Sequence, residues 1–221
     1  LWTSPDESLP LEARLIFDTG QRKEGFLSLY LYHEGQMIYH FNFRFDYNVD
    51  GTPSVYIGTI QGSKHGLETT KVLTKKLFGY RPKNFILYLM RIFVQTLGIH
   101  DIYVITDEGF YTNSHMLRGN RSKKTNFNEF WIGEGAAPDG KEPWYYHLPI
   151  EERRRKYGEI KSQKRNLFRK RYLLMDTIIP PYIAAIKALF RQGFDPVPSA
   201  IDEASSTDKP ADYDPIDPPP K

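Results

Sequence analysis

The stretch PKNFILYLMRIFVQTLGIHDIYVIT, residues 82–106, decides the fold class. Apolar residues recur every four positions from Phe85 to Leu97, a spacing that predicts a helix over residues 82–97 with one buried face. Pro82 suits the first turn of a helix, where its missing N–H costs nothing, and Gly98 suits the position just after a helix ends. The stretch therefore begins with an amphipathic helix that has clear start and stop signals.

The second part of the stretch predicts a strand. Residues 101–106 are short, apolar and rich in β-branched side chains, as expected of a strand that is buried on both faces. Residues 54–61 form another predicted strand before the helix. A strand, a helix and a strand in this order imply a parallel pair joined by a right-handed crossover.

Upstream of the crossover, side chains alternate with the two-residue period of strands. Residues 26–32 and 38–47 both show this alternation, and turn signals follow each of them at 33–36 and at 50–51. Residues 38–47 place five aromatic side chains on one face and five mostly polar ones on the other. We expect one face to be core and the other to be wet or functional. The aromatic face holds Tyr39, Phe41, Phe43, Phe45 and Tyr47, and the other face holds Ile38, His40, Asn42, Arg44 and Asp46.

The remaining elements complete an α/β (α+β) architecture, with a mixed, mainly antiparallel sheet, a crossover helix and C-terminal helices. A strand over residues 13–17 precedes the antiparallel meander, and a short helix over 68–78 precedes the crossover helix. Residues 107–140 are irregular, and 144–148 form a further strand. A basic helix is expected from about residue 151, and a last helix from 181 to 192, with Pro180 and Pro181 at its start.

Composition limits the domain organisation. The chain has 221 residues, of which 40% are hydrophobic, enough for one core. We expect a single domain over residues 1–195 and a disordered tail over 196–221, because the tail is acidic, proline-rich and poor in apolar residues. The absence of cysteine excludes disulfides, thiolate metal sites and a cysteine nucleophile. The histidines lack metal-ligand spacing, so no metal is expected, and no apolar run has the length of a membrane span.

The net charge of +3 hides two opposite segments. Residues 151–172 carry ten Lys or Arg against three Glu, a balance of +7, while 195–221 carry seven Asp or Glu against two Lys, a balance of −5. The basic segment has three candidate anionic partners: nucleic acid, anionic lipid and the acidic tail of its own chain. The alternative is a solvated structural helix whose apolar residues dock on the domain.

The start of the crossover helix is a candidate anion or pyrophosphate site. Gly79, Arg81, Lys83 and Asn84 surround Pro82 there, so free backbone N–H groups, the positive end of the helix dipole and two cations converge. The alternative is that Gly79 only ends the preceding helix and that the two cations are solvated, because no Walker or G-x-G-x-x-G sequence is present.

Candidate acid–base residues follow the buried strand. Asp107, Glu108, Tyr111 and His115 cluster within nine residues, although carboxylates at a strand end often act as caps. The aromatic residues Phe127, Phe130 and Trp131 lie on one face of a short turn or helix further along. They are either satellite core or a wall for an acyl chain.

Several of these segments together resemble the VirK/YbjX family of proteobacterial proteins, over residues 12–176. The resemblance implies a Gram-negative bacterial protein linked to virulence and to envelope changes that resist cationic antimicrobial peptides; the family has no assigned reaction. The segments are Ile57-Gly58-Thr59-Ile60-Gln61-Gly62, Leu73 through Asn84, Tyr103 through Glu108, Phe130-Trp131 and His147-Leu148-Pro149.

The order of elements also resembles the GCN5-related N-acyltransferase fold, which binds acyl-CoA. By that resemblance the acyl donor, acyl-CoA or acyl carrier protein, lies between splayed strands, with no tightly bound cofactor. We expect anionic lipid or the carrier protein as partners of the basic helix, and a cytoplasmic location or a peripheral one at the inner membrane. The implied roles are donor-cleft lining for Gln61 and Gly62, pyrophosphate contacts for Gly79, Arg81, Lys83 and Asn84, and base and acid for Glu108 and Tyr111.

Overall fold

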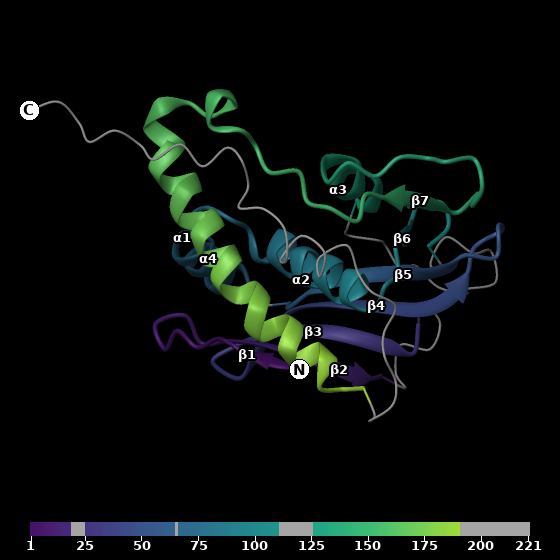
Figure 1. Ribbon diagram of the computed structural model, residues 1–221, viewed down its shortest axis with the longest axis horizontal. Helices are drawn as coiled ribbons and strands as arrows, with labels where there is room; N and C mark the ends of the chain where they lie inside the picture. Colours follow the sequence, from purple (N-terminus) through teal and green to yellow (C-terminus); the bar gives the residue numbers. More distant parts are fainter. Residues whose placement is uncertain (19–24, 65, 111–125, 191–221) are drawn as a thin grey trace, which may run out of the picture.

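A computed structural model describes residues 1–18, 25–64, 66–110 and 126–190, which form a mixed α/β structure (Figure 1). One sheet runs in the order β1-β2-β3-β4-β5-β6-β7. Its strands are β1 (Trp2–Thr3), β2 (Leu11–Phe17), β3 (Leu27–His33), β4 (Gln36–Tyr47), β5 (Pro53–Gly62), β6 (Asp101–Ile105) and β7 (Tyr145–Leu148). The helices are α1 (Leu67–Lys76), α2 (Pro82–Thr96), α3 (Phe127–Gly133), the 3-10 turn η3 (Tyr157–Glu159) and α4 (Ser162–Lys187).

The sheet topology confirms the predicted meander and parallel pair. Strands β2 to β5 pair antiparallel in sequence order, and β5 pairs parallel with β6 through the register Ser54–Asp101 to Ile57–Val104. Strand β7 then pairs antiparallel with β6 at the edge. The helix α2 connects the two parallel strands, as the apolar spacing and the buried strand predicted.

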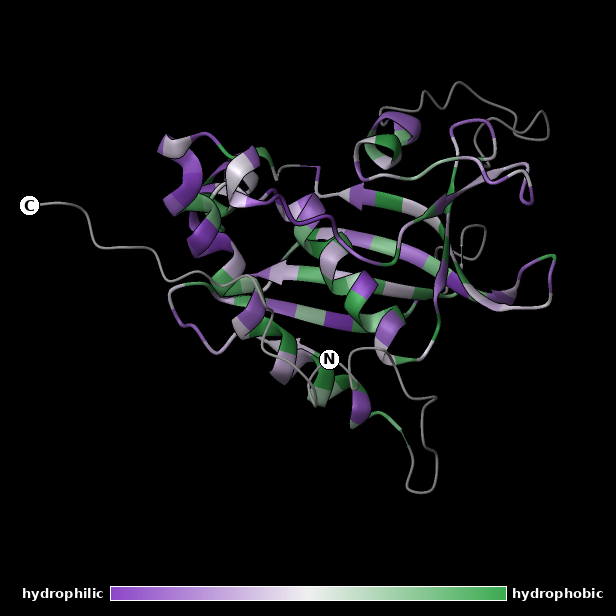
Figure 2. Ribbon diagram, turned by 45° about the horizontal axis from the view of Figure 1, so that its top comes forward, coloured by the Kyte–Doolittle hydropathy of each residue, from purple (hydrophilic) through white to green (hydrophobic). Residues whose placement is uncertain are grey.

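The core lies between the sheet and α2. Phe41 and Phe43 are fully buried on the helix side of β4, and the ring of Phe43 meets that of Phe93 on α2 edge to face at 5.9 Å. Figure 2 shows the alternation of hydrophobic and hydrophilic residues along the strands that produces this face. Gly98 ends α2 with φ of 73°, a conformation that glycine adopts without strain.

The predicted C-terminal helices are wrong in two respects. The segment after residue 151 is irregular and includes the 3-10 turn η3, and α4 begins only at Ser162. Pro180 and Pro181 lie inside α4, which continues through them to Lys187. Both prolines are exposed, whereas a buried stripe spaced by three or four residues runs across them and packs on α2 and β1. Burial of this stripe outweighs the cost of the two missing helical hydrogen bonds. The stripe consists of Met175, Ile178, Tyr182 and Ile186.

The predicted tail over residues 196–221 lies outside the described residues, so the domain boundary stays a prediction. No helix in the described part of the chain is both long enough and apolar enough to cross a membrane.

Candidate functional site

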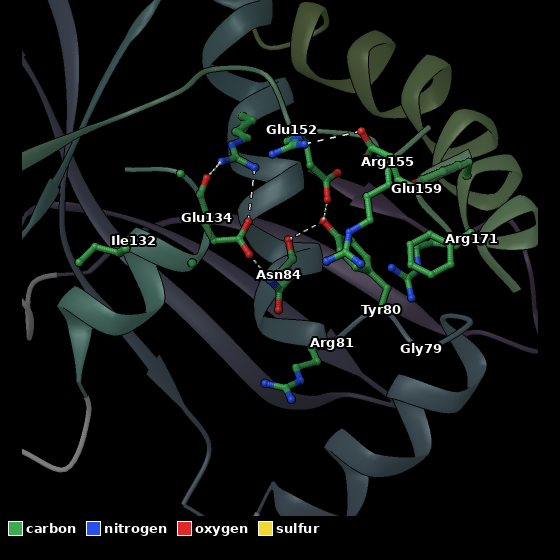
Figure 3. A pocket seen from close by; sticks show the side chains of 16 residues that line it. Gly79, Tyr80, Arg81, Asn84, Ile132, Glu134, Glu152, Arg155, Glu159 and Arg171 are labelled. Carbon is green, nitrogen blue, oxygen red and sulfur yellow. Dashed lines mark hydrogen bonds and ion pairs between the residues drawn. The ribbon is translucent and has the colours of Figure 1, made fainter. Parts of the chain in front are cut away.

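A pocket of about 800 Å³ opens at the N-terminus of α2 (Figure 3). Four segments that are far apart in the sequence line it: the turn that enters α2, the end of α3, the extended segment after β7, and the first half of α4. Five arginines and three glutamates lie in the lining, a formal balance of +2. The arginines are Arg81, Arg91, Arg153, Arg155 and Arg171, and the glutamates are Glu134, Glu152 and Glu159.

Arg171 on α4 is held rigidly at this pocket. Its Nε and Nη2 donate hydrogen bonds to the carbonyl oxygen of Phe78 at 3.2 and 2.9 Å, and its guanidinium lies 4.3 Å from the centre of the Phe168 ring. Phe78 and Gly79 both have positive φ, 51° and 75°, which turns the chain after α1. A side chain at Gly79 would have its Cβ 3.1 Å from Arg171 Nη2, so glycine leaves the space that the guanidinium uses.

Three of the arginines form no ion pair with a carboxylate in the described part of the chain. Among the described residues, no carboxylate forms an ion pair with the guanidinium of Arg81, Arg155 or Arg171. Burial lowers the pKa of Arg171, and the nearby charge of Arg155 lowers it further. Figure 3 shows Arg155 and Arg171 on the same side of the pocket and Arg81 at another edge. Cations that repel each other in a concave site favour an anionic ligand.

The floor of the pocket contains a buried carboxyl and a tyrosine. The Tyr80 hydroxyl donates to Glu152 Oε1 at 2.6 Å. Burial raises the pKa of Glu152, although this hydrogen bond opposes the rise. Burial is also the main reason why the pKa of Tyr80 lies well above its ordinary value. Burial thus favours the protonated tyrosine, which donates this hydrogen bond to Glu152.

Arg91 fixes the segments that surround the pocket. Its buried guanidinium donates to the carbonyl oxygens of Pro149 and Glu134, both at 3.1 Å, and lies 3.6 Å from the carboxylate of Glu134. The Asn84 side chain donates to the same carboxylate. Arg91 thus connects α2 to the end of α3 and to the segment after β7.

The structure brings together some of the predicted pyrophosphate residues and separates others. Gly79, Arg81 and Asn84 line the pocket. Lys83 does not belong to the lining; its Nζ lies 3.6 Å from the centre of the Phe130 ring, and burial lowers its pKa to about 8. The lysine points at α3 and so does not join the arginines in the pocket, and its phosphate contact stays a prediction.

Gln61 and Gly62 lie at the exposed end of β5, outside the pocket lining. Gly62 has a local packing reason to be glycine, since a Cβ there would come 2.8 Å from the Tyr39 ring. The predicted donor-cleft residues therefore do not join the arginines in one site.

The carboxylates after β6 contact the start of α3. Asp107 accepts a hydrogen bond from the Phe127 amide at 2.7 Å, and exposed Glu108 accepts one from the Asn128 side chain at 3.1 Å. That hydrogen bond lowers the pKa of Glu108, which makes its carboxylate a weaker base. Tyr111, the predicted acid, lies outside the described residues.

Trp131 of α3 fills the space beside the end of β6. Its indole is fully buried, donates to the Ile105 carbonyl oxygen at 3.0 Å, and stacks on Phe41 with 6.1 Å between ring centres. Phe127 is buried in the same core. The interpretation of Phe127 and Trp131 as core is confirmed, and Phe130 packs against that core half-buried.

Comparison with protein families agrees with the resemblance read from the sequence. The family described as "Protein of unknown function (DUF535)" matches residues 1–181. This chain belongs to the DUF535 family. The Escherichia coli K12 protein named "Uncharacterized protein YbjX" is 29% identical to this DUF535 chain over 133 residues, which are 59% of the chain and 40% of the relative. The expected VirK/YbjX-like family is thereby confirmed.

A second relative is an uncharacterised protein of Haemophilus influenzae. It is 28% identical over 186 residues, 80% of the chain and 60% of the relative, so the matches span less than two thirds of both relatives. A solved structure, a tyrosine-to-phenylalanine mutant of the AtaT toxin bound to the C-terminus of the antitoxin AtaR, aligns with a TM-score of 0.30 and 12% identity. It covers 63% of this chain and 92% of that one. A score this low carries no argument about the acyltransferase-like fold.

The sequence reading missed several pocket residues of this DUF535 protein. One signal was available in the sequence. Arg91 is a single cation among apolar residues of a helix that was expected to be buried. A buried cation requires a buried partner, so Arg91 indicated a polar contact in the core. Arg153, Arg155 and Arg171 belong to the basic segment that was expected to contact an anion, whereas Glu134 and Glu152 gave no signal, because only the fold brings their distant segments together.

Proposed function

We propose that this DUF535 protein binds the phosphate of an acyl donor, acyl-CoA or acyl carrier protein, in the arginine pocket. It would transfer the acyl group to an amine or hydroxyl of an envelope-related or small-molecule acceptor, in a process linked to virulence and cationic-peptide resistance. The observation that carries the binding step is that Arg81, Arg155 and Arg171 line one pocket beside the start of α2 without an ion pair to any carboxylate among the described residues. A pocket of about 800 Å³ has room for a ligand of nucleotide size.

In this proposal the nitrogen or oxygen of the acceptor attacks the thioester carbonyl, and the C–S bond breaks with its electron pair going to sulfur. Glu108 takes the proton of the acceptor, and Tyr111 gives a proton to the leaving thiolate. The hydrogen bond from Asn128 lowers the pKa of Glu108 and so reduces its strength as the base in this step.

Replacing Arg171 by alanine is expected to weaken binding of pyrophosphate and of CoA by about 10- to 100-fold. The variant loses charge-assisted hydrogen bonds of roughly 1.5–3 kcal/mol. Calorimetric titration of the wild type and the variant measures the change. Arg155→Ala, which removes a guanidinium without the Phe78 contact, should weaken binding in the same direction.

Arg14→Ala is the matched control for this titration. Arg14 lies on β2 outside the pocket, in an exposed pair with Glu12, so its loss should leave both affinities unchanged. The binding proposal fails if neither pyrophosphate nor CoA binds the wild type at millimolar concentration. Binding without acyl turnover would remove only the transferase step.

A second candidate function is supported by the first half of α4. Residues 161–170 are exposed on all sides of the helix except at half-buried Phe168, and no acidic residue occurs from 161 to 175. Figure 2 colours this part mostly as hydrophilic. The alternative is therefore a non-catalytic module that binds anionic lipid or nucleic acid through this basic half. The cations are Lys161, Lys164, Arg165, Arg169 and Lys170.

Charge reversal at Lys164, Arg169 and Lys170 tests this alternative. These side chains are exposed, so the triple change to glutamate should keep the fold while abolishing retention on vesicles that contain phosphatidylglycerol. Retention should also fall with added salt, since the attraction is screened. Co-sedimentation with anionic and with purely zwitterionic vesicles measures it. Equal retention of the wild type and the variant would reject the module, and a duplex DNA arm separates lipid from nucleic acid.

A further inference from the structure

The sheet face that turns away from α2 carries a polar cluster outside the arginine pocket. Side chains alternate along β4, so His40 and Asn42 point away from the helices while Phe41 points toward them. The register places Asn42 opposite Ser28 of β3 and opposite Thr59 of β5. Ser28, Asn42 and Thr59 are fully buried, and His40 is 5% exposed. These four residues are named the back-face cluster.

The back-face cluster has more polar atoms than hydrogen bonds. The Asn42 amide donates to Ser28 Oγ at 2.5 Å. Within the described structure, both ring nitrogens of His40, the Asn42 Oδ1 and the Thr59 Oγ1 have no hydrogen-bond partner although all are buried. Each such atom costs about 1–3 kcal/mol of desolvation, and valine would fill the place of Thr59 without that cost. Four of them on adjacent strands therefore indicate donors and acceptors prepared for a bound group.

A second buried histidine shows that burial alone does not leave histidine nitrogens without hydrogen-bond partners. His33, also on the sheet, is 6% exposed, yet its Nδ1 lies 3.1 Å from the Pro10 carbonyl oxygen and its Nε2 lies 3.8 Å from the Glu34 carboxylate. In the same sheet, then, the ring nitrogens of His33 have partners, whereas those of His40 have no hydrogen-bond partner in the part of the chain that the structure describes.

The surroundings of His40 define the charge of the group that fits. The Tyr30 ring stacks on His40 with 4.8 Å between ring centres, and its hydroxyl donates to the Asp18 carboxylate at 2.6 Å. Burial lowers the pKa of His40 and outweighs the opposing effects of the Asp18 charge and the nearby Asn42 side chain. The imidazole is therefore neutral and supplies one donor and one acceptor.

The cations on this face have other partners. Arg14 pairs with Glu12, and Arg44 pairs with Asp46 and donates to the Tyr145 hydroxyl. With a carboxylate nearby and the cations already paired, the electrostatics of the back-face cluster disfavour an anion and suit a neutral or cationic group.

We propose that the back-face cluster binds the hydroxyl or primary amine end of a neutral or cationic small molecule. The ligand donates to Asn42 Oδ1 and to the unprotonated nitrogen of His40. A hydroxyl end also accepts from the Thr59 hydroxyl, whereas a protonated amine donates to the Thr59 oxygen. The β-bulge between Asn42 and Phe43 lies beside the cluster, as bulges often do next to binding sites. This site shares no residue with the arginine pocket and does not depend on the function proposed for it.

Nuclear magnetic resonance of the imidazole groups tests the site in the full chain. Ethanolamine, ethylene glycol and acetate are titrated to about 100 mM, roughly a hundredfold above the millimolar dissociation constant expected of so small a ligand. Ethanolamine and ethylene glycol should shift the His40 resonances, assigned by their loss in His40→Gln, in a saturable way. The His33 resonances should not shift with either ligand, and acetate should shift the resonances of neither histidine.

Thr59→Val should weaken the ethanolamine response about tenfold, the effect of one hydrogen bond of about 1.4 kcal/mol. Thr96→Val is the matched control, since the buried Thr96 hydroxyl already donates to the Ile92 carbonyl oxygen at 2.7 Å. The inference is overturned if no probe moves the His40 resonances, if acetate moves them equally, or if both threonine variants respond like the wild type.

Discussion

Replacing Trp131 by alanine is expected to lower the free energy of unfolding by about 3–5 kcal/mol, the cost of a large cavity in a packed core. The indole is fully buried against Phe41, and its N–H satisfies the Ile105 carbonyl oxygen at the end of β6. The change removes packing from β4 and leaves that carbonyl without its partner. Urea denaturation followed by circular dichroism measures the effect.

Trp144→Ala is the control for this measurement. Trp144 is 56% exposed, so its loss should cost less than about 1 kcal/mol. Trp131→Phe should fall between the two variants, since it keeps most of the volume and loses the hydrogen bond to Ile105. Equal stability of Trp131→Ala and Trp144→Ala would show that the indole does not hold α3 on the sheet.

Replacing Arg91 by methionine is expected to destabilise the protein by about 3–5 kcal/mol. The guanidinium is buried and provides hydrogen bonds to Pro149 and Glu134, whose polar atoms would lose their partner. The Glu134 carboxylate, only 15% exposed, would become an uncompensated buried charge. Thermal and urea unfolding report the loss, and the arginine pocket should lose pyrophosphate affinity together with it.

A double variant separates charge from packing at this position. Adding Glu134→Gln to Arg91→Met removes the unpaired carboxylate and should recover a measurable part of the stability. Arg14→Met removes an arginine from a comparatively exposed pair with Glu12, and it should change stability by no more than about 1 kcal/mol. Equal losses for Arg14→Met and Arg91→Met would contradict the role given to burial.

Local periodicity was sufficient to predict most of the sheet and α2. The alternation around Phe41 and the start and stop residues Pro82 and Gly98 are properties of neighbouring positions, so one sequence contains them. Helix α4 was mispredicted because long-range packing decides it. Tyr182 and Ile186 carry the buried stripe past two prolines that on local grounds begin a new helix.

The sequence predicted the candidate site only where its residues are neighbours along the chain. Gly79, Arg81 and Asn84 are neighbours at one helix start, and the structure places all of them on the pocket. Lys83 belongs to the same motif but points at Phe130, because a helix turns by about 100° per residue and separates adjacent side chains. Glu152 comes from a segment far along the chain, a separation that no local pattern in one sequence reports.

The two halves of α4 contact different parts of the molecule. Its first half carries Arg171 to the pocket, and its second half places Tyr182 edge to face against Trp2 of β1, with 6.2 Å between ring centres. Because a hydrogen-bonded helix is stiff, a shift of Arg171 must either bend α4 or repack Tyr182 on the sheet edge. Pro180 and Pro181 each lack a backbone N–H for helical hydrogen bonding, so α4 bends most easily at these two positions. One helix therefore contacts both the pocket, through Arg171, and the N-terminal strand, through Tyr182.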